Sequence, residues 1–323
     1  MFAGVDHGTT AIRFATADGE CWELPRIDAS ALSPERIIDL FRQNLGSKVQ
    51  LMAMSYSMGD GLTEIMRLED APNRGLIQQD GAGLHIGGGT IVYEAVRKSG
   101  WPAILLPGIH RGSNIDPRLK VFSHGMSPEK VGLAYFVYRL GVESFIVCDA
   151  SSNTVTFGVL DGRIIGAIDA PIFAPGLTQG PLDVEAIRAV DSGKVTANQA
   201  FSRGGILSKL GRSSLKECSP DEQEASLNSL ALFAAMETSA LQVLLRDLGE
   251  ESPVLYLAGS PAQEIESRVS KLLGRDVCPL GKCAAAHGCA MIAEDVFNGR
   301  SSILGLKVDE RARSWIKHEP KLR

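Results

Sequence analysis

An internal duplication constrains the fold of this chain more than any other feature. Residues 3–20 read AGVDHGTTAIRFATADGE, and residues 146–163 read IVCDASSNTVTFGVLDGR. In each copy an apolar segment ends at an aspartate, a polar turn follows, and an alternating segment runs into Asp-Gly. Because Asp-Gly between alternating apolar runs is a strong hairpin signal, each copy predicts strand, loop, strand, turn and strand. The copies align without a gap, and chance recurrence of turn chemistry is the alternative explanation.

Helical and strand patterns follow each copy, which is the alternation typical of α/β layers. Capping residues and apolar periodicity predict helices near 33–44, 127–140, 221–248, 261–273 and 283–297, and strands near 49–55 and 254–258. A length of 323 residues is enough to bury two separate cores. We therefore expect a first domain at 1–142, a second at 143–300, and a polar, loosely packed tail at 301–323.

Composition excludes several classes of function. A net charge of -5 and a pI near 5.8 argue against a nucleic-acid partner, because backbone binding needs clustered Lys and Arg. No apolar run has the length of a membrane span, and the first residues lack the basic region of a secretion signal, so we expect a cytoplasmic protein without membrane contact. Six cysteines are sparse for this length, and we expect no disulfide framework.

The first loop, Asp-His-Gly-Thr-Thr, is the sharpest motif for chemistry. Gly8 permits close backbone approach to a ligand, and the amides and hydroxyls of Thr9 and Thr10 can surround phosphate oxygens. Asp6, at the strand end, is placed to hold hydrated Mg²⁺, which prefers few protein carboxylates. A plain polar turn is the alternative for this motif taken by itself.

Two further motifs offer groups for a nucleotide. In the second copy Asp149 ends the strand, and Ser151, Ser152 and Asn153 supply hydroxyls and an amide but no glycine. A loop that only caps its hairpin is the alternative there. Farther along, a strand leaves through Gly259 and Ser260 into a helix that we expect Ser260 to cap, and such a helix N-terminus suits a phosphate or adenosine group.

These three motifs resemble the phosphate-1, phosphate-2 and adenosine motifs of the actin, Hsp70 and sugar kinase superfamily. Residues 284–290 look like the last interdomain connecting helix of that superfamily, and residues 87–93 and 166–182 look like segments of butyrate and acetate kinases. The chain from residue 1 to about 300 resembles the methanogenesis marker protein 12 family. The resemblance implies duplicated ribonuclease H-like, or actin-like ATPase, domains with a nucleotide cleft between them, and ATP with Mg²⁺ as cofactors.

The chain also departs from the carboxylate kinases. Those enzymes have a glycine-rich loop where residues 150–154 stand, a second glycine where Ser260 stands, and an acidic residue near 281–283. Nucleotide binding therefore follows from the resemblance more directly than acyl-phosphate chemistry.

Two remaining groups of residues could serve a site. Arg111, in the polar loop 108–118, could reach transferring phosphate oxygens from a cleft, although an ordinary surface loop is the alternative. Cys278, Cys283, Cys289 and His287 suggest metal ligation, as in iron-sulfur activators of the superfamily, but their spacing fits neither a zinc pair nor a ferredoxin run.

Together the motifs predict an ATP-binding kinase or ATPase, with Asp6, Asp149 and Arg111 as candidate catalytic residues. The alternative is a nucleotide-responsive maturation or assembly factor for a methanogenic enzyme that has no kinase turnover. A small-molecule acceptor or a protein partner fits one or the other function, and the sequence is compatible with a homodimer.

Overall fold

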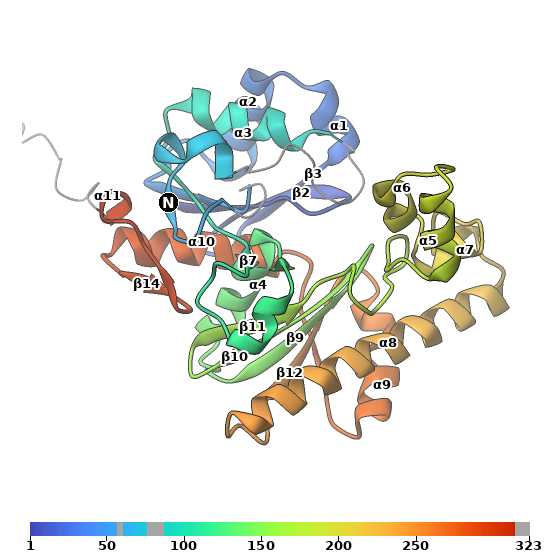
Figure 1. The fold of residues 1–323 in the computed structure, drawn as a ribbon. Helices are drawn as coiled ribbons and strands as arrows, with labels where there is room; N and C mark the ends of the chain where they lie inside the picture. Colours follow the sequence, from blue (N-terminus) through green and yellow to red (C-terminus); the bar gives the residue numbers. More distant parts are fainter. Residues whose placement is uncertain (57–60, 76–86, 314–323) are drawn as a thin grey trace, which may run out of the picture. The chain divides into compact units, whose positions relative to one another are not determined.

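The computed structural model describes residues 1–56, 61–75 and 87–313, which fall into two compact units (Figure 1). Unit 1 contains the described residues up to Val142 together with the segment that begins at Cys283, and unit 2 runs from Glu143 to Lys282. The predicted second domain, 143–300, thus extends too far, because residues from Cys283 onward pack within unit 1.

In the described part of unit 1, six strands form one mixed sheet. Their order across the sheet is β3 (Cys21–Pro25), β2 (Ala11–Thr16), β1 (Phe2–Asp6), β4 (Leu51–Met54), β6 (Ala103–Leu105) and β5 (Met66–Arg67). The first three strands are antiparallel neighbours, β1, β4 and β6 are parallel, and β5 is antiparallel to β6. The sheet thus begins with the predicted hairpin unit and continues with parallel strands.

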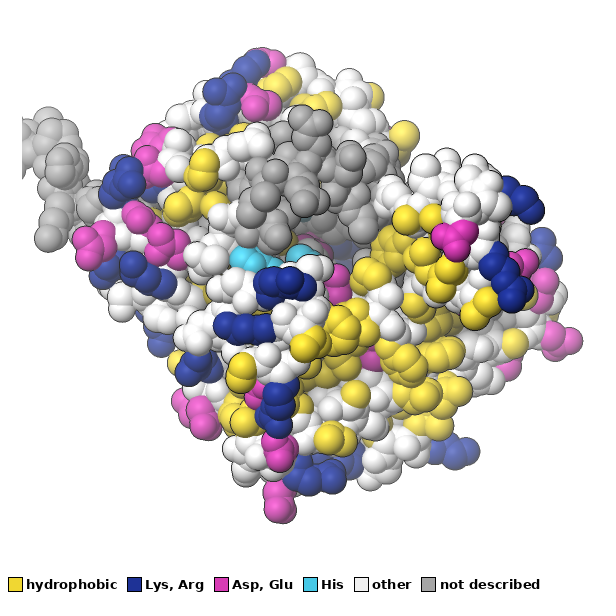
Figure 2. All heavy atoms as spheres, viewed as in Figure 1, with side chains coloured by type: hydrophobic (Ala, Val, Ile, Leu, Met, Phe, Trp, Pro, Cys, Tyr) yellow, Lys and Arg dark blue, Asp and Glu magenta, His cyan; other side chains and the backbone are white. Residues whose placement is uncertain are grey.

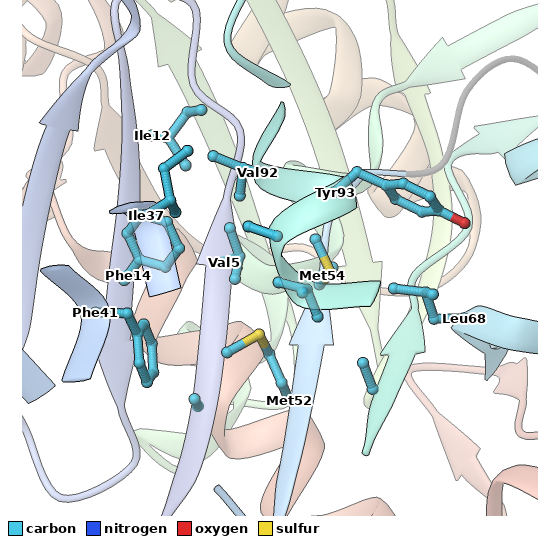
Figure 3. Packing of buried hydrophobic residues seen from close by; sticks show 14 of the residues in the cluster. Val5, Ile12, Phe14, Ile37, Phe41, Met52, Met54, Leu68, Val92 and Tyr93 are labelled. Carbon is cyan, nitrogen blue, oxygen red and sulfur yellow. The ribbon is translucent and has the colours of Figure 1, made fainter. Parts of the chain in front are cut away.

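Three helices cover one face of this sheet: α1 (Arg26–Ala31), α2 (Pro34–Leu45) and α3 (Gly89–Ser99). Ser33 caps α2 as predicted, since its side chain accepts from the Arg36 amide. Figure 3 shows Phe14, Phe41 and Met52 among the side chains that fill the space between sheet and helices, all of them buried. This apolar core explains why apolar residues alternate along the strand segments of the first copy in the sequence.

The other face of the same sheet packs against α10 (Ala284–Phe297), which in turn contacts α4 (Pro128–Arg139). The contact between α10 and β1 is close: a Cβ added at Gly4 would lie 2.1 Å from the Ala286 carbonyl oxygen and 2.3 Å from the Ala290 amide. A Cβ at Gly288 would lie 1.8 Å from the Gly132 oxygen. The small residues of α10 therefore allow close packing against β1 on one side of the helix and against α4 on the other.

In unit 2 the described strands form a sheet of the same plan. The order is β11 (Arg163–Ile168), β10 (Thr154–Leu160), β9 (Phe145–Ala150), β12 (Val254–Ala258) and β13 (Cys278–Pro279). The first three are antiparallel, and β9, β12 and β13 are parallel, as are the equivalent strands of unit 1. The shared order and directions confirm the predicted duplicated α/β fold.

The two hairpins differ in one respect that the gapless alignment hid. In the first hairpin four residues separate β1 from β2, and Asp6 pairs with Arg13. In the second hairpin three residues separate β9 from β10, and Asp149 pairs with Val155. The first loop is thus one residue longer, which gives it more backbone to turn around a ligand.

The helices of unit 2 fall into a pair that covers the sheet and a group of short ones. The long α8 (Pro220–Asp247) and α9 (Ala262–Leu273) lie on one face of the sheet (Figure 1), and their apolar residues pack in the core of unit 2. The short helices α5 (Val184–Asp191), α6 (Ala197–Ser202) and α7 (Ile206–Lys209) lie between β11 and α8 in the chain.

The other described strands of unit 1 and its last helix are short. They are β7 (Ile109–His110), β8 (His124–Met126), β14 (Ser302–Ile303), β15 (Leu306–Lys307) and α11 (Glu310–Arg313). The last three lie in the predicted polar tail, which is not loosely packed in its described part. Ile303, Leu306 and Val308 are buried, and Ile65 exchanges backbone hydrogen bonds with Lys307 and Asp309. Residues 314–323 lie outside the described part.

One disulfide also corrects the sequence analysis. Cys21 in β3 is bonded to Cys283, the residue that precedes α10, and the bond joins positions 262 residues apart. The sequence offered no signal for this pair, because the two residues are far apart in the chain and flanked by unlike segments.

A buried carboxyl group organises the core of unit 2. Glu237 of α8 is 0% exposed, and it accepts hydrogen bonds from the Thr156 hydroxyl at 2.7 Å and from the Ala174 amide at 3.1 Å. Burial raises the pKa of Glu237 to about 8, although these two hydrogen bonds lower it in part. The carboxyl group is therefore mostly protonated at neutral pH.

We expect Glu237→Gln to flatten the pH dependence of stability. The pKa of Glu237 is raised in the folded state, so folding takes up a proton at this residue when the pH lies between the ordinary pKa of 4.5 and about 8. The stabilisation is complete below the unfolded pKa and is lost as pH rises toward 8, on the order of a few kcal/mol in all. Urea unfolding from pH 5 to 9 measures it. The exposed Glu251→Gln is the control, and equal profiles for wild type and Glu237→Gln would contradict the prediction.

Candidate functional site

The loop between β1 and β2, residues 7–10, begins at a carboxylate that the sheet holds in place. Asp6 is 4% exposed, and strand alternation puts it on the face of β1 that Gly4 presents to α10. Its Oδ2 lies 3.4 Å from Nη1 of Arg13, its partner across the hairpin, and Arg13 also donates to Glu23 at 2.9 Å. A carboxylate therefore stands at the mouth of the loop with a cation beside it.

Arg26 fixes the shape of this loop. Its guanidinium donates to the carbonyl oxygens of His7 at 3.0 Å, Gly8 at 2.8 Å and Gly87 at 2.9 Å. The backbone amide of Arg26 donates to the Thr10 carbonyl at 3.0 Å. One residue from the start of α1 thus binds the loop at both ends. Sequence reasoning missed Arg26, because nothing near it in the chain marks it as a partner of residues 7–10.

With the carbonyl groups held in this way, the amides of the loop are left for other partners. The His7 amide donates to the Ser55 hydroxyl at 3.0 Å, but the amides of Gly8, Thr9 and Thr10 donate to nothing in the described part of the chain. Thr9 is half-buried and Thr10 is exposed. Three successive amides and two hydroxyls of this kind are groups with which a loop can hold an anion.

The structure gives a reason for glycine at position 8 besides the predicted approach of a ligand. A Cβ at Gly8 would lie 2.9 Å from the Ala11 carbonyl oxygen and 2.9 Å from Nη1 of Arg13. The close approach that demands glycine is therefore made by the chain itself, and a substitution here would distort the loop before it met any ligand.

His7 is buried beneath the loop. It is 8% exposed, its ring lies 4.4 Å from that of Tyr56 between centroids, and neither ring nitrogen has a hydrogen-bond partner among the described residues. Burial, and secondly the positive charge of Arg26, hold the pKa of His7 well below its usual value. The imidazole is therefore neutral, so it adds no charge to the anion site.

The second loop, residues 151–153, is covered by another segment of unit 2. The Ser152 carbonyl accepts from the amides of Thr178 at 3.0 Å and Gln179 at 2.8 Å, and a Cβ at Gly176 would lie 2.3 Å from the Asn153 Cα. The side chains of Ser151, Ser152 and Asn153 are half-exposed. This loop can thus offer side-chain groups, while part of its backbone is engaged.

The structure brings Gly259 and Ser260, the third motif, next to the second loop, residues 151–153. Ala258 pairs with Asp149 in the parallel strands β12 and β9, and Gly259 follows with φ at +106°. A Cβ at Gly259 would lie 2.1 Å from the Ala150 carbonyl oxygen and 3.1 Å from Oδ1 of Asp149. One correction applies: Pro261, not Ser260, is the N-cap of α9, and Ser260 is exposed.

The other two candidate groups do not join these motifs. Arg111 is exposed, its guanidinium donates to the Val121 carbonyl at 3.4 Å, and no described contact links it to residues 6–10. Among the described residues no group of three His, Cys, Asp or Glu could hold a metal ion, and Cys283 is bonded to Cys21. Cys289 is buried, and burial, with the nearby charge of Asp6, raises the pKa of its thiol.

The residues of the first loop fit a nucleotide phosphate with hydrated Mg²⁺. Amides without a partner in the described chain suit phosphate oxygens, and one carboxylate is what a water-retaining Mg²⁺ usually takes from a protein. Asp6 would hold the ion's water shell, and residues 8–10 would hold the phosphate; Mg²⁺ would supply neutralising charge there.

We expect Arg26→Lys to loosen the loop and destabilise the protein by about 1–3 kcal/mol, because an ammonium group cannot bridge three carbonyl oxygens in the fixed fork of a guanidinium. Urea unfolding gives the change, and hydrogen exchange locates it at the amides of His7 and position 26, which donate to the Ser55 hydroxyl and the Thr10 carbonyl. The exposed Arg36→Lys on α2 is the matched control and should stay within about 0.5 kcal/mol of wild type. Equal exchange rates of these two amides in both variants would contradict this role of Arg26.

Comparison with known structures supports the fold assignment. Acetate kinase from Porphyromonas gingivalis aligns with 88% of this chain and 89% of its own, with a TM-score of 0.52 and 9% sequence identity. At that identity the likeness shows a shared fold, the actin-like ATPase type that the resemblance of the motifs implied.

Comparison with known sequences gives the family. No protein-family model matches the chain. A UPF0285 protein of Methanosarcina mazei is 47% identical over 322 residues, which cover 95% of this chain and 99% of the relative. A UPF0285 protein of Methanocaldococcus jannaschii is 37% identical over 325 residues, which cover 95% of this chain and 98% of the relative. At these identities over nearly the whole length of each protein, the chain belongs to the UPF0285 protein family.

Proposed function

We propose that this protein binds ATP with Mg²⁺ through the loop 7–10 and transfers or hydrolyses the γ-phosphate. One observation carries the proposal: Arg26 takes the carbonyl groups of the loop and leaves the amides of residues 8–10 for an anion, directly after Asp6. A fold shared with acetate kinase, which transfers phosphate, makes a nucleotide the favoured anion.

The remaining site residues are assigned in the same terms. Asp149, Ser151, Ser152, Asn153, Gly259 and Ser260 form a second set of groups in unit 2 and would contact the nucleotide. Asp6 and Asp149 stay candidate catalytic residues. Arg111 has no described link to either set, and its assignment rests on the sequence motif alone.

The biological setting follows from the relatives. UPF0285 proteins of methanogens and the resemblance to methanogenesis marker protein 12 favour a role connected with methanogenesis. The cytoplasm stays the location expected from the sequence. The phosphoryl acceptor would be a small carboxylate if the likeness to acetate kinase extends to substrate. A nucleotide-responsive maturation factor, which binds ATP and captures a protein partner without turnover, is the alternative.

We expect Asp6→Asn to remove the Mg²⁺-dependent part of ATP affinity. The amide keeps the shape and a hydrogen bond to Arg13 but loses the charge that orients the metal's waters, so Kd with Mg²⁺ should rise about tenfold, or about 1.4 kcal/mol. Calorimetric titration with ATP, with and without Mg²⁺, measures this. Asp18→Asn, in the exposed turn at the other end of the hairpin, is the control. A Mg²⁺ effect that survives in Asp6→Asn would count against the assignment.

Turnover separates the two functions. Incubation of the full chain with ATP, Mg²⁺ and a series of small carboxylates should release ADP steadily with at least one of them if the protein is a kinase. Release without any acceptor would indicate an ATPase. ATP binding without ADP release would favour the maturation factor, and no binding of ATP under any condition would refute the proposed function.

A further inference from the structure

The long helix α8 has an apolar face that nothing in the described chain covers. Leu232, Met236 and Val243 are 45%, 45% and 63% exposed. They lie four and seven residues apart, with exposed Ala240 between the last two, so they occupy one side of the helix. We call these four residues the α8 stripe. The opposite side packs in the core of unit 2 through Leu230, Ala234, Leu241 and other buried residues.

The exposed side of α8 also lacks charge. Between residues 225 and 245 the single charged residue is Glu237, which is 0% exposed. A helix that faces solvent normally carries charged residues on its outer side, and an apolar outer side marks a contact surface. Figure 2 shows hydrophobic side chains gathered over the middle of α8.

An apolar cavity next to the α8 stripe widens this surface. The cavity has a volume of ≈ 430 Å³ and lies between α8, the segment before α5, and α7. Its walls include Phe173 and Phe233, whose rings meet edge to face at 5.8 Å, and the exposed Leu210. The surface therefore extends sideways from the helix and is broader than one row of side chains.

The surroundings of the α8 stripe argue against a membrane as its occupant. The sequence predicted no apolar run as long as a membrane span, but by length and composition α8 could cross a bilayer. However, 44% of its apolar window is buried within the protein, and that part would have to leave the core. Surface binding to anionic lipid needs Lys and Arg beside the apolar face. The ends of α8 carry four acidic residues, Asp221, Glu222, Glu224 and Asp247, against one basic residue, Arg246.

The pattern of side chains points to the same surface on another molecule. In an antiparallel pair of α8 helices with a two-fold axis at Met236, residues equally far from Met236 on its two sides lie opposite each other. Leu232 of one copy then lies against Ala240 of the other, and Val243 lies against Ser229. Met236 then meets its own copy on the axis, and the large side chains of Leu232 and Val243 each meet a small one, which lets ridges enter grooves. Because a two-fold interface uses one patch twice, this self-complementarity is what it requires.

We propose that the α8 stripe joins two copies of this chain across a two-fold axis near Met236. The stretch 225–247 is about 34 Å long and about 10 Å wide, which is less than the roughly 800 Å² that each partner contributes to a standard interface. The adjoining cavity wall supplies part of the difference. The dimer is therefore reversible, with a Kd of about micromolar.

The test is sedimentation velocity of the full chain from about 1 to 100 µM. We expect wild type to shift from monomer to dimer across this range. Met236→Lys should stay monomeric, since the axis brings each introduced charge against its own copy. Leu272→Lys, at an apolar position 52% exposed on α9, is the matched control and should dimerise like wild type. Circular dichroism checks that each variant folds, and Val243→Lys is the second variant if Met236→Lys does not.

A mixture of opposite charges makes the test specific for this axis. Met236→Lys and Met236→Glu should each be monomeric, and an equimolar mixture should recover the dimer, because unlike charges then meet. Monomeric wild type at every concentration overturns the proposal, as does a dimer that Met236→Lys and Val243→Lys leave intact. Binding to neutral phosphatidylcholine vesicles that Met236→Lys abolishes, with no dimer, also overturns it.

Discussion

The contact between α10 and β1 is the constraint on which unit 1 depends. Gly4 leaves no room for a side chain between its backbone and the Ala286 carbonyl group, so the helix backbone lies directly on the strand. Asp6 lies two residues farther along the same face, and its distance from the helix is set by that contact. The position of the proposed metal-binding carboxylate therefore rests on small residues that carry no chemistry themselves.

The first loop is organised by a division of its backbone groups. Arg26 takes the carbonyl groups of His7 and Gly8, and its own amide takes the carbonyl group of Thr10. Because the carbonyl groups of the loop are held on one side, its amides face the other side. The loop can therefore offer hydrogen-bond donors to an anion without a helix dipole. The neutral His7 beneath contributes packing and no competing charge.

The sequence predicted the parts of this structure that depend on local patterns. The repeated strand, Asp and hairpin pattern predicted the three antiparallel strands that begin each sheet, and Ser33 predicted the start of α2. What it missed depends on contacts between distant segments. Arg26 binds the carbonyl group of Gly8 from 18 residues farther along the chain, and the tail is held by Ile65. The helix α10 packs with the strands of the first copy, not with those that precede it in the chain. A gapless alignment could not show that one loop is longer, because strand pairing, not residue count, sets its ends.

The bond between Cys21 and Cys283 closes nearly the whole chain into a covalent ring. Unit 1 is built from both ends of the chain, and all of unit 2 lies inside that ring as an insertion. A protease that cuts once anywhere in unit 2 would leave two fragments still joined through sulfur, so the two halves of unit 1 could not drift apart. The two parts of unit 1 would thus stay together even when the backbone of unit 2 is cut.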